Sequence, residues 1–160
     1  MTRSTTINPI IADLNKLLAN LIDFYFTYKH FHWHITGQDF YPFHLEFDKN
    51  ASIIYANWDL IAERIRQLGG EAQASGRQVI NNSNLPQYAS LDLTKQLNLQ
   101  DYVLIHLEAC HEQTIITLNS VIEQAGAASD FSTADILTAI LEEQQQMHWF
   151  ISSSIDNLEE

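Results

Sequence analysis

The sequence contains little cysteine, glycine and proline. Of its 160 residues, one is Cys, five are Gly and three are Pro. The single cysteine, Cys110, excludes an intrachain disulfide and argues against a cysteine-based zinc site. So few Gly and Pro residues argue against an all-β fold, which needs turn residues about every ten positions. The composition therefore favours an all-α domain, and the chain is long enough to form a hydrophobic core of its own.

Basic residues are also scarce. The chain has 8 Lys and Arg against 20 Asp and Glu, for a net charge of −12. Residues 81–160 carry one of the cations and twelve of the acids, so the acidity belongs to the second half. Such a charge repels phosphate backbones, and direct DNA binding is therefore doubtful. Because the sequence has no leader peptide and no apolar run of about 18 residues, we expect a cytoplasmic protein without a membrane partner.

Four long helices are predicted from start and stop signals. They are expected to run from Asn8-Pro9 to Thr36-Gly37, from Tyr41-Pro42 to Gly69-Gly70, from Leu99 to Ala125, and from Ser132-Thr133-Ala134-Asp135 to about Ile155. Pro after a capping residue is typical of a helix start, and Gly of a left-handed stop. The last helix is expected to start by a capping-box-like spacing, with Ser132 as the cap and Asp135 three residues later. The prediction is a four-helix bundle with a short segment or helix in the crossover between the second and third helices. We expect a single domain of residues 1–160, with residues 1–8 as a flexible tail.

The histidines of the first helix do not share one face. At about 100° per residue, His32 lies on the apolar stripe with Leu14 and Leu21. His30 and His34 fall on the opposite face, where we expect them to be solvated. The three histidines are therefore not predicted to form a metal-binding cluster.

Polar residues on one stripe of the second helix form two pairs, His44 with Asp48 and Asp59 with Glu63. Within each pair the spacing of i, i+4 lets both side chains approach one ligand. The pairs are separated by roughly 22 Å at 1.5 Å per residue, so they cannot bind the same ion within one chain. They are symmetric about the midpoint between Ile53 and Ile54, so an antiparallel two-fold dimer would bring His44 to Glu63 and Asp48 to Asp59.

Imidazole with several carboxylates suits a divalent first-row ion such as iron. Two further interpretations stay open at this point. His32 and His44 could be core or interface histidines, and Asp59, Glu63 and Arg64 could form an intrahelical charge network.

Four motifs carry a resemblance to a known family. They are His32-Trp33, Gly37-x-x-Phe40, His44-Leu45-x-Phe47-Asp48 and Asp59-x-x-Ala62-Glu63-Arg64-Ile65-x-x-Leu68-Gly69-Gly70. This stretch resembles the Dps family, the mini-ferritins named for DNA protection during starvation. The last predicted helix also resembles the family, in Thr133-Ala134-Asp135-Ile136 and Trp149-Phe150-Ile151.

The resemblance implies a ferritin-like bundle that assembles, through two-fold dimers, into a hollow shell of twelve subunits. It also implies a ferroxidase site between subunits, which oxidises Fe(II) to Fe(III) with hydrogen peroxide or dioxygen. The shell would store the ferric mineral and so protect against oxidative damage. The metal-binding and catalytic residues implied are His32, His44, Asp48, Asp59 and Glu63, the last two from the neighbouring chain. Iron is the expected metal, and no organic cofactor is expected.

Two further roles, for three residues, follow from the same resemblance. Trp33 is a candidate radical trap, although it could equally be an interface anchor. Asp130 and Asp135 are candidates for a pore that admits iron, although Asp135 could instead complement a helix dipole.

Competing functions stay open as well. A conventional ferritin would hold iron inside one bundle, and one motif of that kind exists, Glu108-Ala109-Cys110-His111, but no second copy. We instead expect Cys110, His111 and His148 to pack in the bundle or at its edges, and His106 to lie at an edge. The protein could also be a DNA-binding, nucleoid-protecting shell with secondary iron oxidation, or a structural shell without oxidation.

Overall fold

A computed structural model of the protein describes residues 9–89 and 99–155 and contains five helices in these ranges. The helices are α1 (Pro9–His34), α2 (Phe40–Gln67), α3 (Gly76–Asn82), α4 (Leu99–Ala127) and α5 (Phe131–Ile155). The all-α prediction is confirmed, including a short helix in the crossover between the second and third long helices. The proposed tail, residues 1–8, lies outside the described residues. None of the described helices is long and apolar enough to cross a membrane.

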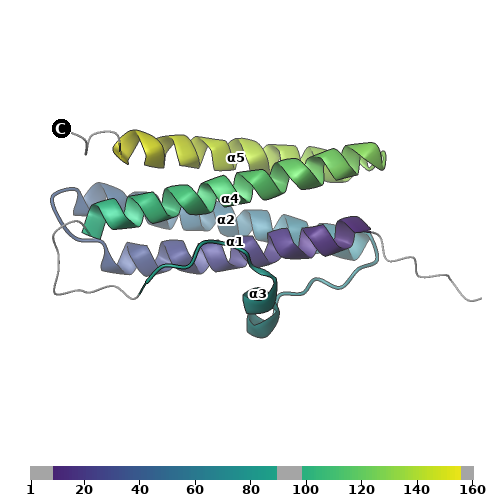
Figure 1. Ribbon diagram of the computed structural model, residues 1–160, viewed down its shortest axis with the longest axis horizontal. Coiled ribbons are helices and arrows are strands. Elements are labelled where there is room, and N and C mark those ends of the chain that lie inside the picture. Colours follow the sequence, from purple (N-terminus) through teal and green to yellow (C-terminus); the bar gives the residue numbers. More distant parts are fainter. Residues whose placement is uncertain (1–8, 90–98, 156–160) are drawn as a thin grey trace, which may run out of the picture.

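The long helices form two antiparallel hairpins, α1 with α2 and α4 with α5, packed side by side (Figure 1). The crossover returns along the bundle, so α4 runs parallel to α2, and α3 packs on the outside of α1. The core between the hairpins consists of Leu, Ile and Phe side chains from all four long helices. Its largest fully buried side chain is Tyr28 of α1, which is polar at its tip.

The predicted glycine stop of the second helix is confirmed. Gly69 has φ +87°, in the left-handed region that favours glycine, and the Gly70 amide donates to the Ile65 carbonyl at 2.9 Å. A side chain at Gly70 would lie 2.7 Å from a side-chain carbon of Ile11 on α1. Both glycines are therefore needed where the chain leaves α2 and passes close to α1.

The predicted turn between the last two helices is partly wrong. α4 continues through Gly126 to Ala127, and Ser129 takes the left-handed conformation, with φ 58°. α5 begins at Phe131, and its cap is the Asp130 carboxylate, which accepts from the Thr133 amide at 3.1 Å. Asp130 takes the capping place that the sequence pattern assigned to Ser132, because its carboxylate also accepts from the Thr133 hydroxyl at 2.6 Å.

Polar side chains of α1 hold the crossover against the bundle. The Asn15 side-chain oxygen accepts from the Gln73 amide, and its nitrogen donates to the Glu71 carbonyl. Asn20, which is fully buried, makes two hydrogen bonds with Asn84, at 2.7 and 2.9 Å. Asn15 and Asn20 are buried, so these hydrogen bonds to the crossover satisfy their side chains.

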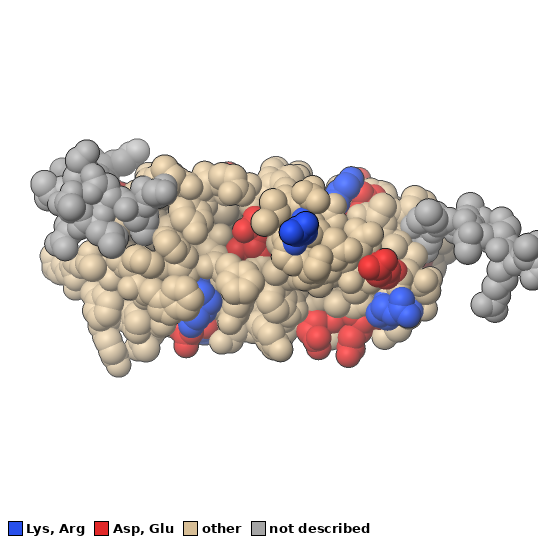
Figure 2. All heavy atoms as spheres, turned by 90° about the horizontal axis from the view of Figure 1, so that it is seen from below, with Lys and Arg blue, Asp and Glu red and all other residues tan. Residues whose placement is uncertain are grey.

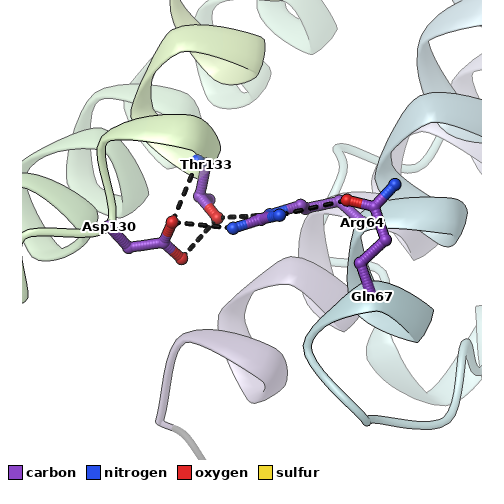
Figure 3. A network of polar contacts seen from close by, with 4 residues as sticks. All are labelled: Arg64, Gln67, Asp130 and Thr133. Carbon is purple, nitrogen blue, oxygen red and sulfur yellow. Dashed lines mark hydrogen bonds and ion pairs between the residues drawn. The ribbon is translucent and has the colours of Figure 1, made fainter.

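An ion pair joins α2 to the turn between α4 and α5 (Figure 3). An Arg64 guanidinium nitrogen lies 2.8 Å from an Asp130 carboxylate oxygen, and both side chains are 16% exposed. Arg64 also donates to the Thr133 hydroxyl at 2.9 Å and to Gln67 at 3.0 Å. Burial raises the pKa of Asp130, but the hydrogen bonds from Thr133 and the charge of Arg64 outweigh it, and the pKa is lowered.

Replacing this cap tests its contribution to stability. Asp130→Ala is expected to destabilise the protein by about 1–2 kcal/mol at pH 7, because it removes the cap of α5 and leaves Arg64 half of a pair. The lowered pKa of Asp130 means that its contribution is present above the ordinary value of about 3.9 and is lost as the pH falls through the folded value.

Thermal unfolding followed by circular dichroism at pH 7 and at acidic pH measures both effects. The exposed residue Glu123 on α4 provides the control, Glu123→Ala. If the difference in melting temperature between wild type and Asp130→Ala does not become smaller at acidic pH, the ionised Asp130 carboxylate does not stabilise α5 as described.

Candidate metal centre

His32 near the end of α1 and His44 near the start of α2 are held face to face. Their ring centroids are 3.8 Å apart and the rings are nearly parallel, at 19°. The Nδ1–H of His32 donates to the His44 carbonyl at 2.7 Å, and the Nδ1–H of His44 donates to the His32 carbonyl at 2.8 Å. A histidine that donates through Nδ1 keeps its Nε2 lone pair for a metal. The hydrogen bonds through Nδ1 therefore leave the Nε2 atom of both rings available to a ligand.

Asp48 lies one turn after His44 on α2 and is paired with a lysine. Its carboxylate lies 2.6 Å from the Lys29 ammonium of α1. The hydrogen bond from Lys29 lowers the pKa of Asp48, with further lowering by the charges of Lys29, His32 and His44. No local sequence pattern connects Lys29 to a residue nineteen positions away, so this pair was not predicted. His32 and His44 thus lie together, and Asp48 is near enough for their charges to lower its pKa. The ligand atoms of the three residues do not all lie within 4.8 Å of one another, and the Asp48 carboxylate is paired with the Lys29 ammonium.

Asp59 and Glu63, the remaining predicted ligands, lie further along α2 and are exposed. Asp59 lies at a groove of about 700 Å³ between α1, α2 and α3. The groove is lined mainly by apolar side chains, namely Leu18, Ile22, Phe26, Trp58, Ala62, Val79 and Ile80. Within one chain, the Asp59–Glu63 pair therefore stays far from the His44–Asp48 pair, as the rise of a continuous helix requires.

The three residues with other predicted roles lie away from the histidine pair or at its edge. Trp33 is 64% exposed, and the Lys29 ammonium lies 5.9 Å from its ring centre. Asp135 is exposed in the first turns of α5, whereas Asp130 is engaged with Arg64 and Thr133. Their roles as radical trap and pore residues stay predictions.

His111, the histidine of the Glu108-Ala109-Cys110-His111 motif, is fully buried, as expected, and both of its ring nitrogens are occupied. Its Nε2 accepts from the Tyr28 hydroxyl at 2.5 Å, and its Nδ1–H donates to Gln144 at 2.9 Å. Burial lowers the pKa of His111 to about 3, so the ring stays neutral. Because no lone pair of His111 is free, a conventional ferritin site that uses this histidine is not supported.

Two expectations about the remaining histidines are wrong. His30 and His34 are partly buried, and His30 stacks on Tyr88 of the crossover, with ring centres 4.9 Å apart. His106 is buried rather than at an edge, and it also contacts Tyr88. His30 and His106 are covered by Tyr88 because the crossover folds back over α1 and α4, which the periodicity of a single helix does not show. His34 stacks on His30, with ring centres 4.3 Å apart. Burial lowers the pKa of His30 and of His106.

Comparison with known proteins places these features in a family. Residues 11–160 match the family described as Ferritin-like domain. The chain is 32% identical to the DNA protection during starvation protein of Agrobacterium fabrum over 149 residues, which covers 91% of this chain and 87% of that protein. The chain belongs to the Dps family of ferritin-like proteins.

Solved structures agree with this assignment. Dps from Thermosynechococcus elongatus superposes with a TM-score of 0.82 at 28% identity, over 91% of this chain and 89% of that chain. A Dps protein from Vibrio cholerae, described as a member of a broad superfamily of ferritin-like diiron-carboxylate proteins, has the same TM-score of 0.82 at 22% identity, over 91% of this chain and 88% of that chain. The Dps resemblance and the ferritin-like fold expected from the sequence are therefore confirmed.

Removing Lys29, which pairs with Asp48, tests whether the Asp48 carboxylate contributes to a metal site at His32 and His44. Lys29→Gln is expected to tighten zinc binding at His32 and His44 several-fold, because a positive charge next to the incoming cation is removed. Zinc titration at pH 7 measures the affinity, and the His32→Ala variant gives the zinc binding that remains without the histidine pair.

Lys49→Gln is the matched control, since Lys49 is also on the α1–α2 hairpin but pairs with Glu46, at 3.6 Å. Unchanged or weaker zinc binding in Lys29→Gln would show that Asp48 is not a ligand.

Proposed function

We propose that the protein is a mini-ferritin that oxidises Fe(II) to Fe(III) at sites between the subunits of a hollow shell and stores the ferric product. The observation that carries the proposal is the His32–His44 pair, whose Nδ1–H groups are tied to backbone carbonyls while Asp48 lies beside the rings. This arrangement supplies imidazole and carboxylate donors but leaves the ligand set incomplete within one chain.

A second copy of the chain completes the site in this proposal. When two α2 helices cross antiparallel about a two-fold axis near Ile53 and Ile54, the Asp59–Glu63 pair of one chain faces the His44–Asp48 pair of the other. The groove beside Asp59 supports this arrangement, because two large apolar side chains that line it are exposed, Phe26 by 58% and Ile80 by 79%. Tyr55, which is 54% exposed, packs against Trp58 of the same lining, with ring centres 5.2 Å apart. Large exposed apolar side chains grouped on one face are typical of protein interfaces.

The surface charge supports the same interface. On the face that carries α1 and α3, most of the surface is uncharged, and the few basic side chains are interspersed with acidic ones (Figure 2). A second copy that covers this face buries few unpaired charges. Twelve-subunit shells built from such dimers are the assembly that the resemblance to Dps implies.

The donor set accounts for oxidation of the iron substrate. Hard anionic oxygens stabilise Fe(III) more than Fe(II), because the higher charge gains more from carboxylate donors. Two Fe(II) ions each lose one electron, and one hydrogen peroxide molecule accepts both as its O–O bond breaks, so no hydroxyl radical is released. Asp135 and the other carboxylates of α4 and α5 then provide acidic surface for admitting or nucleating iron.

Removal of the histidine pair tests the proposed oxidation site. His32→Ala with His44→Ala is expected to slow peroxide-dependent Fe(II) oxidation by at least about tenfold, because both imidazole ligands are lost. Optical absorbance follows the ferric product, and light scattering checks that the shell mass is unchanged. His30→Ala with His34→Ala is the control for removing two histidines from the same region. The proposal fails if the His32/His44 variant oxidises iron at the wild-type rate.

Mixed shells test whether the site lies between two chains. The His32/His44 variant and an Asp59→Asn/Glu63→Gln variant each lack one half of every site. When they are dissociated and reassembled together, mixed dimers contain one complete site, and oxidation is expected to recover to about one quarter of the wild-type rate for random pairing. A monomeric mass, or no recovery in mixed shells of full mass, would contradict the inter-subunit site.

Direct DNA binding is the second function to test, because the relative in Agrobacterium fabrum is named for DNA protection. The net charge of −12 and the absence of a continuous basic patch on the described surface of Figure 2 argue against it. We expect no gel shift at low salt in the presence of a chelator. A shift under these conditions would show that the electrostatic argument is wrong, whereas a shift only with Mg²⁺ would indicate bridging by the cation.

A further inference from the structure

A second group of ligand-type side chains lies between α4 and α5. His148 Nε2 of α5 is 3.9 Å from an oxygen of Glu108 and 3.9 Å from an oxygen of Glu112, both on α4. Among residues 9–89 and 99–155, this is the one group of three or more His, Cys, Asp or Glu whose ligand atoms all lie within 4.8 Å of one another. No part of the proposed iron-oxidation site uses these residues.

The His148 ring nitrogen has no satisfactory protein partner. Nε2 is buried and makes no hydrogen bond to any described residue, since 3.9 Å is too long for one. Buried polar atoms are usually satisfied, so an unsatisfied ring nitrogen that faces two carboxylates indicates a missing partner.

The two carboxylates also lack a basic partner. Neither α4 nor α5 contains a single Lys or Arg. The ion pairs of the described residues connect Glu108 and Glu112 only to His148. Two carboxylates one helical turn apart repel each other, and a cation between them would relieve this repulsion.

We propose that Glu108, Glu112 and His148 bind a divalent first-row cation within a single chain. Ligand atoms around a tetrahedral zinc lie about 3.4 Å apart when each is about 2.1 Å from the metal. The two separations of 3.9 Å from His148 therefore need to contract by about half an ångström, and the two carboxylate oxygens, which lie within 4.8 Å of each other, by at most about 1.4 Å. Glu112 is exposed and Glu108 is partly exposed, so their carboxylates can move by this amount and the site is open to solvent. Water completes the coordination.

This site differs from the interior site of a conventional ferritin. His111, which such a site would use, is saturated by Tyr28 and Gln144, and its ring centre lies 6.4 Å from that of His148. The cation therefore sits one layer outside the buried Tyr28–His111–Gln144 network. Because all three ligands come from one chain, the site exists whether or not the subunits form a shell and does not depend on the proposed oxidation site.

Zinc and cobalt binding to the intact protein test the proposal. In the His32→Ala/His44→Ala background, equilibrium dialysis against zinc at pH 7.5 is expected to retain one ion per chain. Adding Glu108→Gln with Glu112→Gln, which keeps the side-chain shapes, is expected to remove this ion.

Two further measurements identify the ligands. Visible absorption of bound cobalt is expected to show low-symmetry coordination that disappears in the Glu108→Gln/Glu112→Gln variant. An anomalous difference map from zinc-soaked crystals is expected to show a peak about 2.1 Å from His148 Nε2.

Glu142→Gln with Glu143→Gln is the matched control, because it removes two exposed carboxylates from α5 without touching the cluster. It is expected to leave the bound zinc unchanged. Equal loss of zinc in both double variants would show non-specific attraction to negative charge and would overturn the proposal. Absence of zinc from the His32/His44 background would also overturn it and would leave His148 as a simple partner of the two glutamates.

Discussion

The rigidity of α2 is the constraint on which the proposed function depends. A continuous helix of 28 residues cannot bend to bring its own ends together, so His44 and Asp48 stay far from Asp59 and Glu63. An ion that needs both pairs must therefore lie between two chains. The local structure agrees with this division, because only the histidine end is organised within one chain, by two reciprocal hydrogen bonds, while the carboxylate end is exposed beside an apolar groove.

The middle of the bundle core contains a neutral hydrogen-bond network in which His111 has no free nitrogen for a metal. Tyr28 from α1, His111 from α4 and Gln144 from α5 form a continuous network of neutral hydrogen bonds in the middle of the core. Burial raises the pKa of Tyr28 and lowers that of His111, so both remain uncharged. A neutral network of this kind fixes the relative positions of the helices without a counter-ion. It leaves the ends and faces of the helices as the places where charge and metal can be accommodated.

The sequence predicted the parts of the fold that depend on local rules. Helix number, the Gly69–Gly70 stop and the long crossover follow from periodicity and turn chemistry, and the fold itself is confirmed. Errors arose where distant segments meet. His30 and His106 are covered by Tyr88 from the crossover, and Asp130 replaces Ser132 as the cap because its carboxylate makes two hydrogen bonds with Thr133. Lys29 and the grouping of Glu112 with His148 likewise depend on helix packing, which spacing along one helix cannot reveal.

The uneven charge of the chain matches its division into two helix hairpins, α1 with α2 and α4 with α5. Residues 1–80 carry seven of the eight cations together with eight acids, and ion pairs such as Lys29 with Asp48 are made within this half. The second hairpin has acids on α4 and α5 without any Lys or Arg, so its counter-charge comes from Arg64 on α2, from a histidine or from solution. Metal cations are the solution species that carboxylates and imidazole bind best together. The acidic half of the chain is therefore suited to attract the cations that the proposed function assigns to the histidine pair of the first half.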